Sequence, residues 1–558
     1  MDVDVVVIGS GAGGLAAAVA LARAGKKVLV LEQHYLPGGW CHSFSLGGYR
    51  FSPGVHYLGE LGEGGMLRRI YEGLGMGQDL AFCELNPDGY DHVVLGGGAA
   101  GGRHQRYDYV RGKERLADAL SASFPAEQRG LRAYLDAVQA IGRELGALTS
   151  VSGLGDVAKL PLRAPTALRW MLSSARSLIE HHVSDPRLRA VLGAQAGDHG
   201  LPPSQAPAVL HAAVQAHYLE GGYYPRGGGA ALPRAFIRAL RRAGGSIRVK
   251  APVSRILVEG RRAIGVRLAD GTEVRARAVV SNADPQITLG RLVGHEHLSR
   301  VERLRLARAR WSVSALSLFL ATDLDLRALG LDSGNTWLFR DGDVDRTYAA
   351  CLAGWSAADG PLPGGFVTAT TLKDPSKDYG GVHTLEAFAF VGWDAFRAWT
   401  DTSSGSRPES YDANKRALLA RMLEMVGQVV PGVEDHVVFA ALGTPLTNEH
   451  YCAATHGNLY GTEKSLTHIG PFGQPLHTSI AGLWTCGAST LSHGVMGAHV
   501  SGLAVAARIL RCRFTELLAT GGAPVTLLSS EHPERWPRKP QRGGRAEGGA
   551  AGVAEAHA

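Results

Sequence analysis

The sequence predicts an α/β protein whose chain begins with a Rossmann-like βαβ unit. Residues 3–8 form an apolar run, broken only by Asp4, that ends at a glycine cluster, which is typical of a strand buried on both faces of a parallel sheet. Residues 15–24 follow as an Ala/Leu-rich helix without a breaker, and residues 28–31 form a second predicted strand. With 558 residues the chain is too long for one compact core, so we expect two or more domains.

The turn between the first predicted strand and helix matches the dinucleotide-binding fingerprint G-x-G-x-x-G. Gly9 permits the tight turn, Gly11 lets the backbone approach a pyrophosphate, and Gly14 allows the helix to pack closely on the strand. The free N–H groups at the helix N-terminus favour phosphates, and Glu32 would accept hydrogen bonds from ribose hydroxyls. The expected dinucleotide-binding residues of this segment are Gly9, Ser10, Gly11, Ala12, Gly13, Gly14 and Glu32.

The composition is that of a globular protein, with 45% hydrophobic and 20% charged residues. The net charge of +7 indicates either an arginine-rich composition or weak attraction to an anionic membrane surface, and nothing in the pattern suggests a nucleic-acid partner. The six cysteines are scattered without a C-x-x-C pair, which predicts no disulfide framework and fits a reducing compartment. Cys41 and His42 lack the further partners that a metal ion needs, so no metal site is predicted.

We expect a cytoplasmic protein that is peripheral at the inner face of a membrane. The first strand starts almost at Met1, which leaves no room for a signal peptide. Residues 481–507 contain no Lys, Arg, Asp or Glu, but their glycines and two histidines predict a strand, a loop and a buried helix rather than a membrane span. The apolar and basic residues of 160–180 would form an amphipathic patch at the membrane or pack inside a helical domain.

Periodicity and turn signals divide the rest of the chain into elements. Helices are predicted at 66–76, 113–148, 166–182, 205–218, 230–243, 408–428 and 497–511. An irregular hairpin is predicted at 92–110, short strands joined by hairpins at 246–282, and further strands at 315–321, 366–372 and 480–486. Residues 533–558 are rich in Pro, Gly, Arg and Ala without periodicity, so we expect a disordered tail.

Beyond the fingerprint, a series of motifs resembles the superfamily of flavin-dependent amine oxidases and phytoene desaturases. The motifs are PGG after Glu32, GYRF-x-PGVHY, YYPRGGGAALPRAFIRALRRAGGSIRVKAPVSRI, AVVSNADP and GLWTCGASTLSHGVMGAHVSGLAVAARIL. Together they cover most of residues 1–515. Within the superfamily, GVHYLGE, GTPLTNEHY and HGNLYGTEKS most resemble the branch of retinol saturases (all-trans-retinol 13,14-reductases) and carotenoid isomerases.

The resemblance implies a Rossmann-like FAD-binding domain of the glutathione reductase and amine oxidase type, with an inserted α+β substrate domain. The FAD-binding domain is expected in three parts, at 1–110, at 221–300 with β-hairpins, and at 476–515. The substrate domain would have a helical part at 111–220 and a second part at 301–475.

The resemblance also implies roles for individual residues. Gly9, Gly11 and Gly14 would hold the FAD pyrophosphate, and Glu32 would hold the adenosine ribose. Further contacts with FAD are expected from Gly39, Val253, Gly487, Val495 and Met496. No second fingerprint for NAD(P)H follows in the middle of the chain, so electrons would come from or pass to an unknown partner.

The implied activity is saturation or desaturation of a carbon–carbon bond in an apolar polyene isoprenoid, a retinol or a carotenoid, by hydride transfer at flavin N5. A proton must also move, and His56 is the candidate for that role, although a hydrogen-bonded structural histidine fits the pattern as well. Ser52 stands where the superfamily often has an aspartate. Other candidates are His493 and His499 for the proton, and Tyr57, Tyr223 and Tyr224 for a tunnel wall or ordinary core.

Three other functions share parts of this pattern. A redox-neutral carotenoid cis-trans isomerase would use the same cofactor, and an amine oxidase would place two aromatic rings beside the flavin. A non-enzymatic lipid carrier of the Rab-escort type shares the first fingerprint, but the C-terminal flavin-type motif argues against it.

Overall fold

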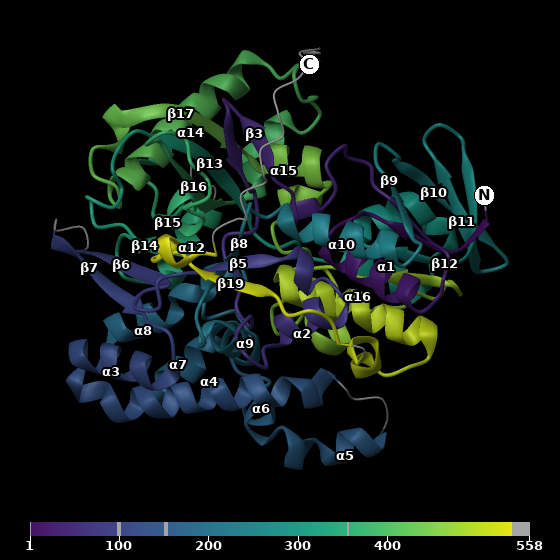
Figure 1. Cartoon of the computed structure of the whole chain (residues 1–558), viewed down its shortest axis with the longest axis horizontal. Coiled ribbons are helices and arrows are strands. Elements are labelled where there is room, and N and C mark those ends of the chain that lie inside the picture. The colour runs from purple at the N-terminus through teal and green to yellow at the C-terminus, as the bar shows by residue number, and fades with distance from the viewer. Residues whose placement is uncertain (1, 98–101, 150–153, 354–356, 520, 538–558) are drawn as a thin grey trace.

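The structure, a computed structural model, describes residues 2–97, 102–149, 154–353, 357–519 and 521–537 (Figure 1). It contains two seven-stranded sheets, one with β1 and β12 and the other with β13 to β17. The two sheets lie side by side, and a layer of helices lies below the second sheet in Figure 1. This arrangement confirms the predicted α/β fold.

The first sheet is the predicted Rossmann-like unit. Its strand order is β10-β11-β12-β1-β2-β9, and β18 also pairs with β12. β1 runs parallel to β2 and β12, and all four residues of β2 are buried, as expected of a strand covered on both faces. The bounds are β1 Asp2–Ile8, β2 Val28–Leu31, β9 Ser246–Arg248, β10 Val253–Glu259, β11 Arg262–Leu268, β12 Glu273–Ser281 and β18 Leu483–Thr485.

Three helices cover one side of this sheet and come from distant parts of the chain. α1 (Ala12–Arg23) packs against α10 (Ala231–Arg242) and α16 (Gly494–Leu510). Where α1 crosses α16, a side chain at Gly502 would collide with the Gly13 carbonyl, so the two helices approach closely only because a glycine stands there. The first and last parts of the domain are thereby held together.

The second sheet has the strand order β17-β13-β16-β15-β14-β6-β7. All neighbouring pairs are antiparallel except β14 and β6, which run parallel. The bounds are β6 Asp91–Gly97, β7 Gly102–Tyr109, β13 Ser314–Thr322, β14 Asn335–Phe339, β15 Gly364–Ala369, β16 His383–Val391 and β17 Val437–Gly443.

Helices cover one face of this sheet and share its core. Leu131 and Tyr134 of the helical layer belong to the same buried cluster as Val93 and Trp337 of the sheet. The helices of the layer are α3 Lys113–Ser123, α4 Gln128–Thr149, α5 Leu154–Arg163, α6 Pro165–Trp170, α7 Ala175–His182, α8 Pro186–Gly193 and α9 Ala208–Tyr218.

The remaining strands and helices lie outside the two large sheets and the helical layer. The strands are β3 Phe44–Leu46 and β4 Tyr49–Phe51, which pair with each other, and β5 Ala81–Glu84, β8 Tyr223–Pro225 and β19 Thr526–Ser529, which form a three-stranded sheet. The remaining helices are α2 Met66–Gly73, α11 Arg300–Ala307, α12 Val344–Leu352, α13 Thr370–Lys373, α14 Glu409–Gly427 and α15 Pro445–Cys452. In the described parts of the chain, no helix combines the length and apolarity needed to cross a membrane.

Three predicted elements differ from the structure for local reasons. The helix expected at 113–148 is two helices, because Pro125 lacks the N–H that a continuous helix needs. The helix expected at 166–182 is interrupted before Ala175, where the Ser174 hydroxyl caps a new helix by accepting a hydrogen bond from Ser177 N. The strand expected at 366–372 ends at Ala369 and continues as α13.

The expected end of the first FAD-binding part at residue 110 stays a prediction. β6 (Asp91–Gly97) and β7 (Gly102–Tyr109) belong to the second sheet, so we propose that this boundary lies before Asp91. The expected disordered tail starts too early, because Trp536 donates a hydrogen bond to the Ser529 carbonyl at 2.7 Å and lies beneath the Arg226 guanidinium. The rest of that tail, 538–558, lies outside the described residues.

Candidate active site

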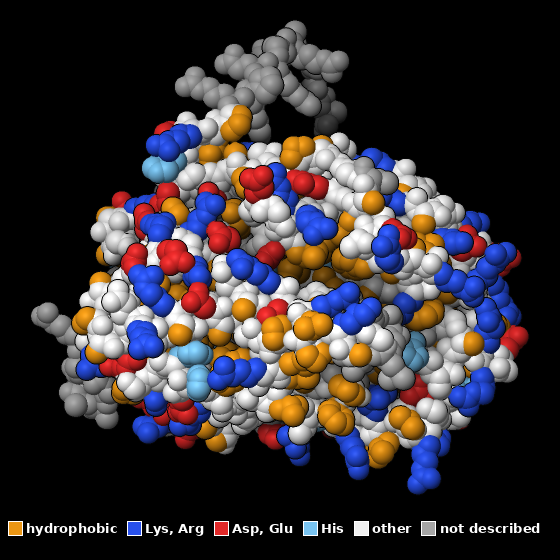
Figure 2. Space-filling model, turned by 90° about the horizontal axis from the view of Figure 1, so that it is seen from below, with side chains coloured by type: hydrophobic (Ala, Val, Ile, Leu, Met, Phe, Trp, Pro, Cys, Tyr) orange, Lys and Arg blue, Asp and Glu red, His pale blue; other side chains and the backbone are white. Residues whose placement is uncertain are grey.

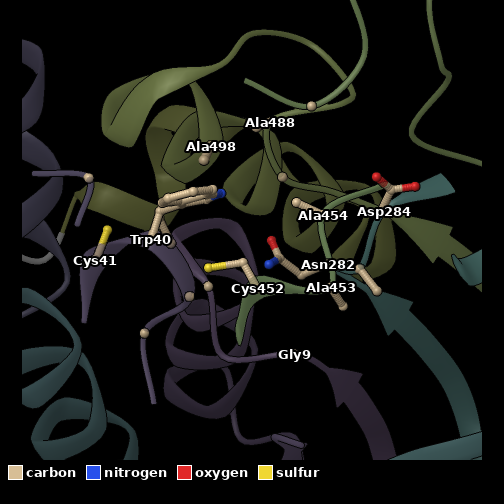
Figure 3. A pocket seen from close by; sticks show the side chains of 18 of the residues that line it. Gly9, Trp40, Cys41, Asn282, Asp284, Cys452, Ala453, Ala454, Ala488 and Ala498 are labelled. Atoms are coloured by element: carbon tan, nitrogen blue, oxygen red, sulfur yellow. The ribbon is translucent and has the colours of Figure 1, made fainter. Parts of the chain in front are cut away.

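A pocket lies at the carboxyl ends of β1, β2 and β12, with a cavity volume of about 280 Å³. Open α/β sheets bind their ligands at this end of the strands. The pocket continues from the loop after β1 to the face of the second sheet, where Ala315, Ser317 and Phe388 line it. Figure 3 shows the side chains of Trp40, Cys452 and Asn282 gathered above the loop that begins at Gly9.

The fingerprint loop adopts the conformation that its glycines were predicted to allow. Gly9 has φ +87°, and a side chain at Gly14 would collide with the Gly9 carbonyl oxygen. A Cβ at Gly11 would lie 2.5 Å from Asn282 Nδ2, inside the pocket. The side chain of Asn282 therefore borders the start of α1, and its Oδ1 accepts a hydrogen bond from Gly14 N at 2.9 Å.

Glu32 joins the fingerprint loop to the segment after β2. Its Oε2 accepts hydrogen bonds from Ser10 N at 2.8 Å and from the Ser10 hydroxyl at 2.6 Å, and its Oε1 accepts one from His34 N at 2.9 Å. The Ser10 hydroxyl in turn accepts a hydrogen bond from Gly38 N at 2.9 Å. The carboxylate is thus fixed at the pocket wall, and Oε1 retains a lone pair for a ribose hydroxyl.

The predicted cofactor residues divide into two groups. The pocket is lined by Gly9, Gly11, Ala12, Gly13, Glu32, Gly39, Val253, Gly487 and Val495. Ser10, Gly14 and Met496 do not line it. Ser10 is fully buried beneath Glu32, Gly14 serves the packing of α1 on β1, and Met496 packs against the core of the first domain.

His56 lies where the pocket meets the second sheet. Its Nδ1 is 3.2 Å from Oε2 of Glu386, whose side chain is 1% exposed. The ring also contacts Phe366 and Phe388, with centroids 5.3 and 5.6 Å away. His56 is therefore the predicted histidine that borders the pocket, and it has a carboxylate partner that the sequence did not reveal.

The other predicted histidines and tyrosines lie in the protein interior. Burial lowers the pKa of His493 and His499 to about 3, so both rings are neutral at physiological pH. Neither histidine lines the pocket, and His499 stacks on Phe236 in the first domain. The rings of Tyr57, Tyr223 and Tyr224 also belong to the buried core rather than to the pocket wall.

Sequence reasoning missed several residues of the pocket and its surroundings. Asn282 follows β12 directly, and the rule that residues after parallel strands line the site would have found it. Phe388 and Glu386 lie on β16, which local pattern alone does not place beside the pocket. Glu386 also lies next to Ser52, because its Oε1 accepts a hydrogen bond from the Ser52 backbone N at 2.6 Å. A carboxylate from the second sheet thus lies near the position where the superfamily often has an aspartate.

The residues present fit a flavin dinucleotide. Gly39 and Gly11 face each other so closely that a Cβ on Gly39 would lie 3.2 Å from the Gly11 Cα, which leaves backbone rather than side chains around the phosphate position. The α1 N-terminus favours the pyrophosphate charge, and Glu32 disfavours a 2′-phosphate on the ribose. Across the described ranges, no three His, Cys, Asp or Glu side chains are placed to hold a metal ion.

A Rossmann-like sheet assembled from three separate chain segments, with a glycine cradle for a pyrophosphate, defines a dinucleotide-dependent flavoprotein. This chain belongs to the flavin containing amine oxidoreductase family, whose sequence pattern matches residues 12–510. Its cofactor is FAD, and the protein is an FAD-dependent oxidoreductase.

Comparison with known proteins confirms the expected superfamily and branches. The chain is similar to all-trans-retinol 13,14-reductase of Danio rerio, with 32% identity over 91% of this chain and 86% of the relative. It is 28% identical to the chloroplastic prolycopene isomerase of Arabidopsis thaliana, over 91% of this chain and 82% of that protein. An oxidoreductase from Methanosarcina mazei has the same fold, with a TM-score of 0.59, 19% identity and coverage of 90% and 99% of the two chains.

Proposed function

We propose that this enzyme reduces a carbon–carbon double bond in an apolar polyene isoprenoid of the retinoid or carotenoid class. One observation carries the proposal. The pocket extends from the FAD-binding loops to the ring of Phe388 on the second sheet, and His56 lies where the two parts meet. The similarity to retinol reductases over nine-tenths of the chain supports the same substrate class.

The second sheet supplies an apolar wall for such a substrate. Ser317 pairs with Phe388 across β13 and β16, and Phe388 stacks on Phe366 with centroids 4.8 Å apart. Trp337 meets the Phe366 ring edge-on at 4.7 Å, and both rings support Phe388 without lining the pocket themselves. An aromatic wall binds a flat conjugated chain and excludes water from the reacting carbons.

The side chains have separate tasks in this reaction. When bound, FAD supplies the hydride that one carbon receives. His56 donates the proton to the neighbouring carbon, because its ring borders the pocket while Nδ1 faces Glu386. The electrons that reduce FAD come from a donor outside this chain, since no second dinucleotide fingerprint is present in the sequence.

The similarity to prolycopene isomerase favours a second candidate, redox-neutral cis-trans isomerisation on the same apolar wall. Anaerobic incubation of the photoreduced holoenzyme with retinol and with a panel of carotenes separates the two. A product heavier by two hydrogens with a shortened chromophore supports reduction, whereas unchanged mass with a shifted retention time supports isomerisation. Consumption of an amine without any change in the polyenes would overturn both proposals.

We also propose that the protein is peripheral at the cytoplasmic face of a membrane, held there by α5, α6 and the residues that follow. Leu162 and Leu172 are 87% and 86% exposed, and Lys159, Arg163 and Arg169 are exposed beside them. Figure 2 shows hydrophobic side chains grouped on the lower face between basic ones. This combination suits an interface with anionic lipid.

Flotation with vesicles that contain anionic lipid tests this surface at low salt. We expect the Leu162→Ser and Leu172→Ser double variant to lose binding, and the matched variant Leu304→Ser, exposed on α11, to retain it. Failure of the wild type to float with any vesicle would refute the membrane proposal.

A further inference from the structure

A row of polar side chains crosses the second sheet next to the pocket. The register places Glu386 of β16 beside Thr368 of β15, Thr368 beside Asn335 of β14, and Asn335 beside Asp91 of β6. We call these four residues the polar row, and none of them is more than 2% exposed. The neighbouring row consists of Phe388, Phe366, Trp337 and Val93. Burying the polar row instead of an apolar one costs free energy, so its presence requires a reason.

Lys373 lies over the polar row and connects it to His56. Its ammonium donates hydrogen bonds to the Asn335 side-chain oxygen and to the His56 carbonyl, the latter at 2.6 Å. Asn335 Nδ2 donates to Asp91 Oδ1 at 2.7 Å. The charged groups around Lys373 are Asp91, Asp198, Glu386 and Lys377. Hydrogen bonds therefore extend from the row to the backbone of His56, and charge interactions extend from Lys373 to Glu386 beside the His56 ring.

The far end of the row holds a shared proton. The Tyr57 hydroxyl lies 2.6 Å from Asp198 Oδ2 and 3.0 Å from Asp91 Oδ2. One hydroxyl carries a single hydrogen, so it donates to one carboxylate and accepts from the other, which must be protonated. Desolvation also favours a protonated carboxylate, because it raises the pKa of Asp91 to about 6 and the pKa of Asp198 well above its usual range.

The near end of the row holds an acceptor without a proper donor. Glu386 Oε2 is buried and has no well-aligned hydrogen-bond partner among the described residues, and the same is true of His56 Nδ1, 3.2 Å away. A small rotation of the ring would bring the two atoms into a hydrogen bond. Burial also lowers the pKa of Lys373 to about 7, which lets it both accept and give a proton near neutral pH.

We propose that Glu386 is the positioning residue of His56 and that Asp91, Asp198, Tyr57 and Lys373 form a proton store that resupplies it. This inference rests on the proposed reduction. Each turnover adds one hydride from the reduced cofactor and one proton from His56 to the double bond. His56 then regains its proton from the store by way of Glu386, whose charge interacts with Lys373 and whose Oε2 lies 3.2 Å from His56 Nδ1, and the store regains one from water. An apolar substrate fills the pocket, so resupply through the protein interior replaces resupply by bulk water.

Difference infrared spectroscopy tests the store without any turnover. At neutral pH we expect the carbonyl stretch of a protonated carboxylic acid in the wild type. Asp198→Asn should remove it, because burial raises the pKa of Asp198 well above its usual range and the remaining carboxylate of Asp91 can accept a hydrogen bond from Tyr57 without a proton of its own. The matched variant Asp332→Asn, whose carboxylate contacts His92 at 2.8 Å and has a lowered pKa, should keep the band. A wild-type spectrum without this band would overturn the store.

Kinetics test the positioning role. We expect Glu386→Gln to keep FAD and the Ser52 hydrogen bond, but to lower turnover on the order of 10²-fold and to shift the pH profile of turnover. A purely structural role would change thermal stability and leave the pH profile in place, which would overturn this assignment. If the wild type itself leaves every polyene unchanged, the proposed function fails instead, and the infrared result still decides the store.

Discussion

The substitution Gly11→Ala separates cofactor binding from folding. Gly11 has φ −63°, so an alanine fits its backbone without strain. The added Cβ would lie 2.5 Å from Asn282 Nδ2, the end of a side chain that can move aside. The methyl group would then occupy the space through which the backbone approaches the pyrophosphate. The apoprotein should therefore fold normally and bind FAD weakly.

The expected size of the effect follows from the hydrogen bonds lost. A backbone hydrogen bond to a charged phosphate contributes about 1.5–3 kcal/mol, so losing one weakens binding by roughly 10- to 160-fold. Titration of the apoprotein with FAD, followed by quenching of flavin fluorescence, measures this directly. Gly155→Ala is the matched control, because its added Cβ meets no atom within 4 Å. Unchanged FAD affinity in folded Gly11→Ala protein would refute this account of the cradle.

Two further predictions concern His56 at the pocket and Lys373 behind it. His56→Ala should keep FAD and lower turnover by about 10²–10⁴-fold, the usual contribution of general acid catalysis; turnover within about threefold of the wild type would reject the proton role. Lys373 has a pKa lowered from 10.5 to about 7, so the unfolded chain binds more protons between these values and stability should rise with pH there, by about 1.4 kcal/mol per pH unit. Denaturant titrations at several pH values measure the free energy of unfolding. This free energy should rise less steeply with pH in Lys373→Met than in the wild type, and an equal dependence on pH would contradict the burial argument.

The first sheet was predictable because its signals are local. The strand, glycine turn, helix and second strand of 2–31 follow one another without interruption, and each has its own sequence pattern. The predicted pocket residues around Gly9 and Glu32 follow from this order alone. Gly487 and Val495 are distant in sequence, and they were found only through the resemblance to a family.

The polar row was not predictable, because it is defined by register between strands. Asp91, Asn335, Thr368 and Glu386 each look like an ordinary polar residue within an alternating strand. Only the pairing of four strands places them on one line, and Lys373 reaches that line because α13 interrupts the predicted strand 366–372. Long-range pairing of this kind leaves no mark in a local window of sequence.

The assembly of the first sheet from distant segments has a consequence for synthesis of the protein. β1 emerges from the ribosome first, but β18 at Leu483–Thr485 and α16 at Gly494–Leu510 emerge near the end of translation. Until then the apolar residues of α1 that pack on α16 have no cover, and the nascent chain exposes them. A message that stops before residue 483 would therefore encode a chain that never closes its cofactor domain, however complete its second sheet is.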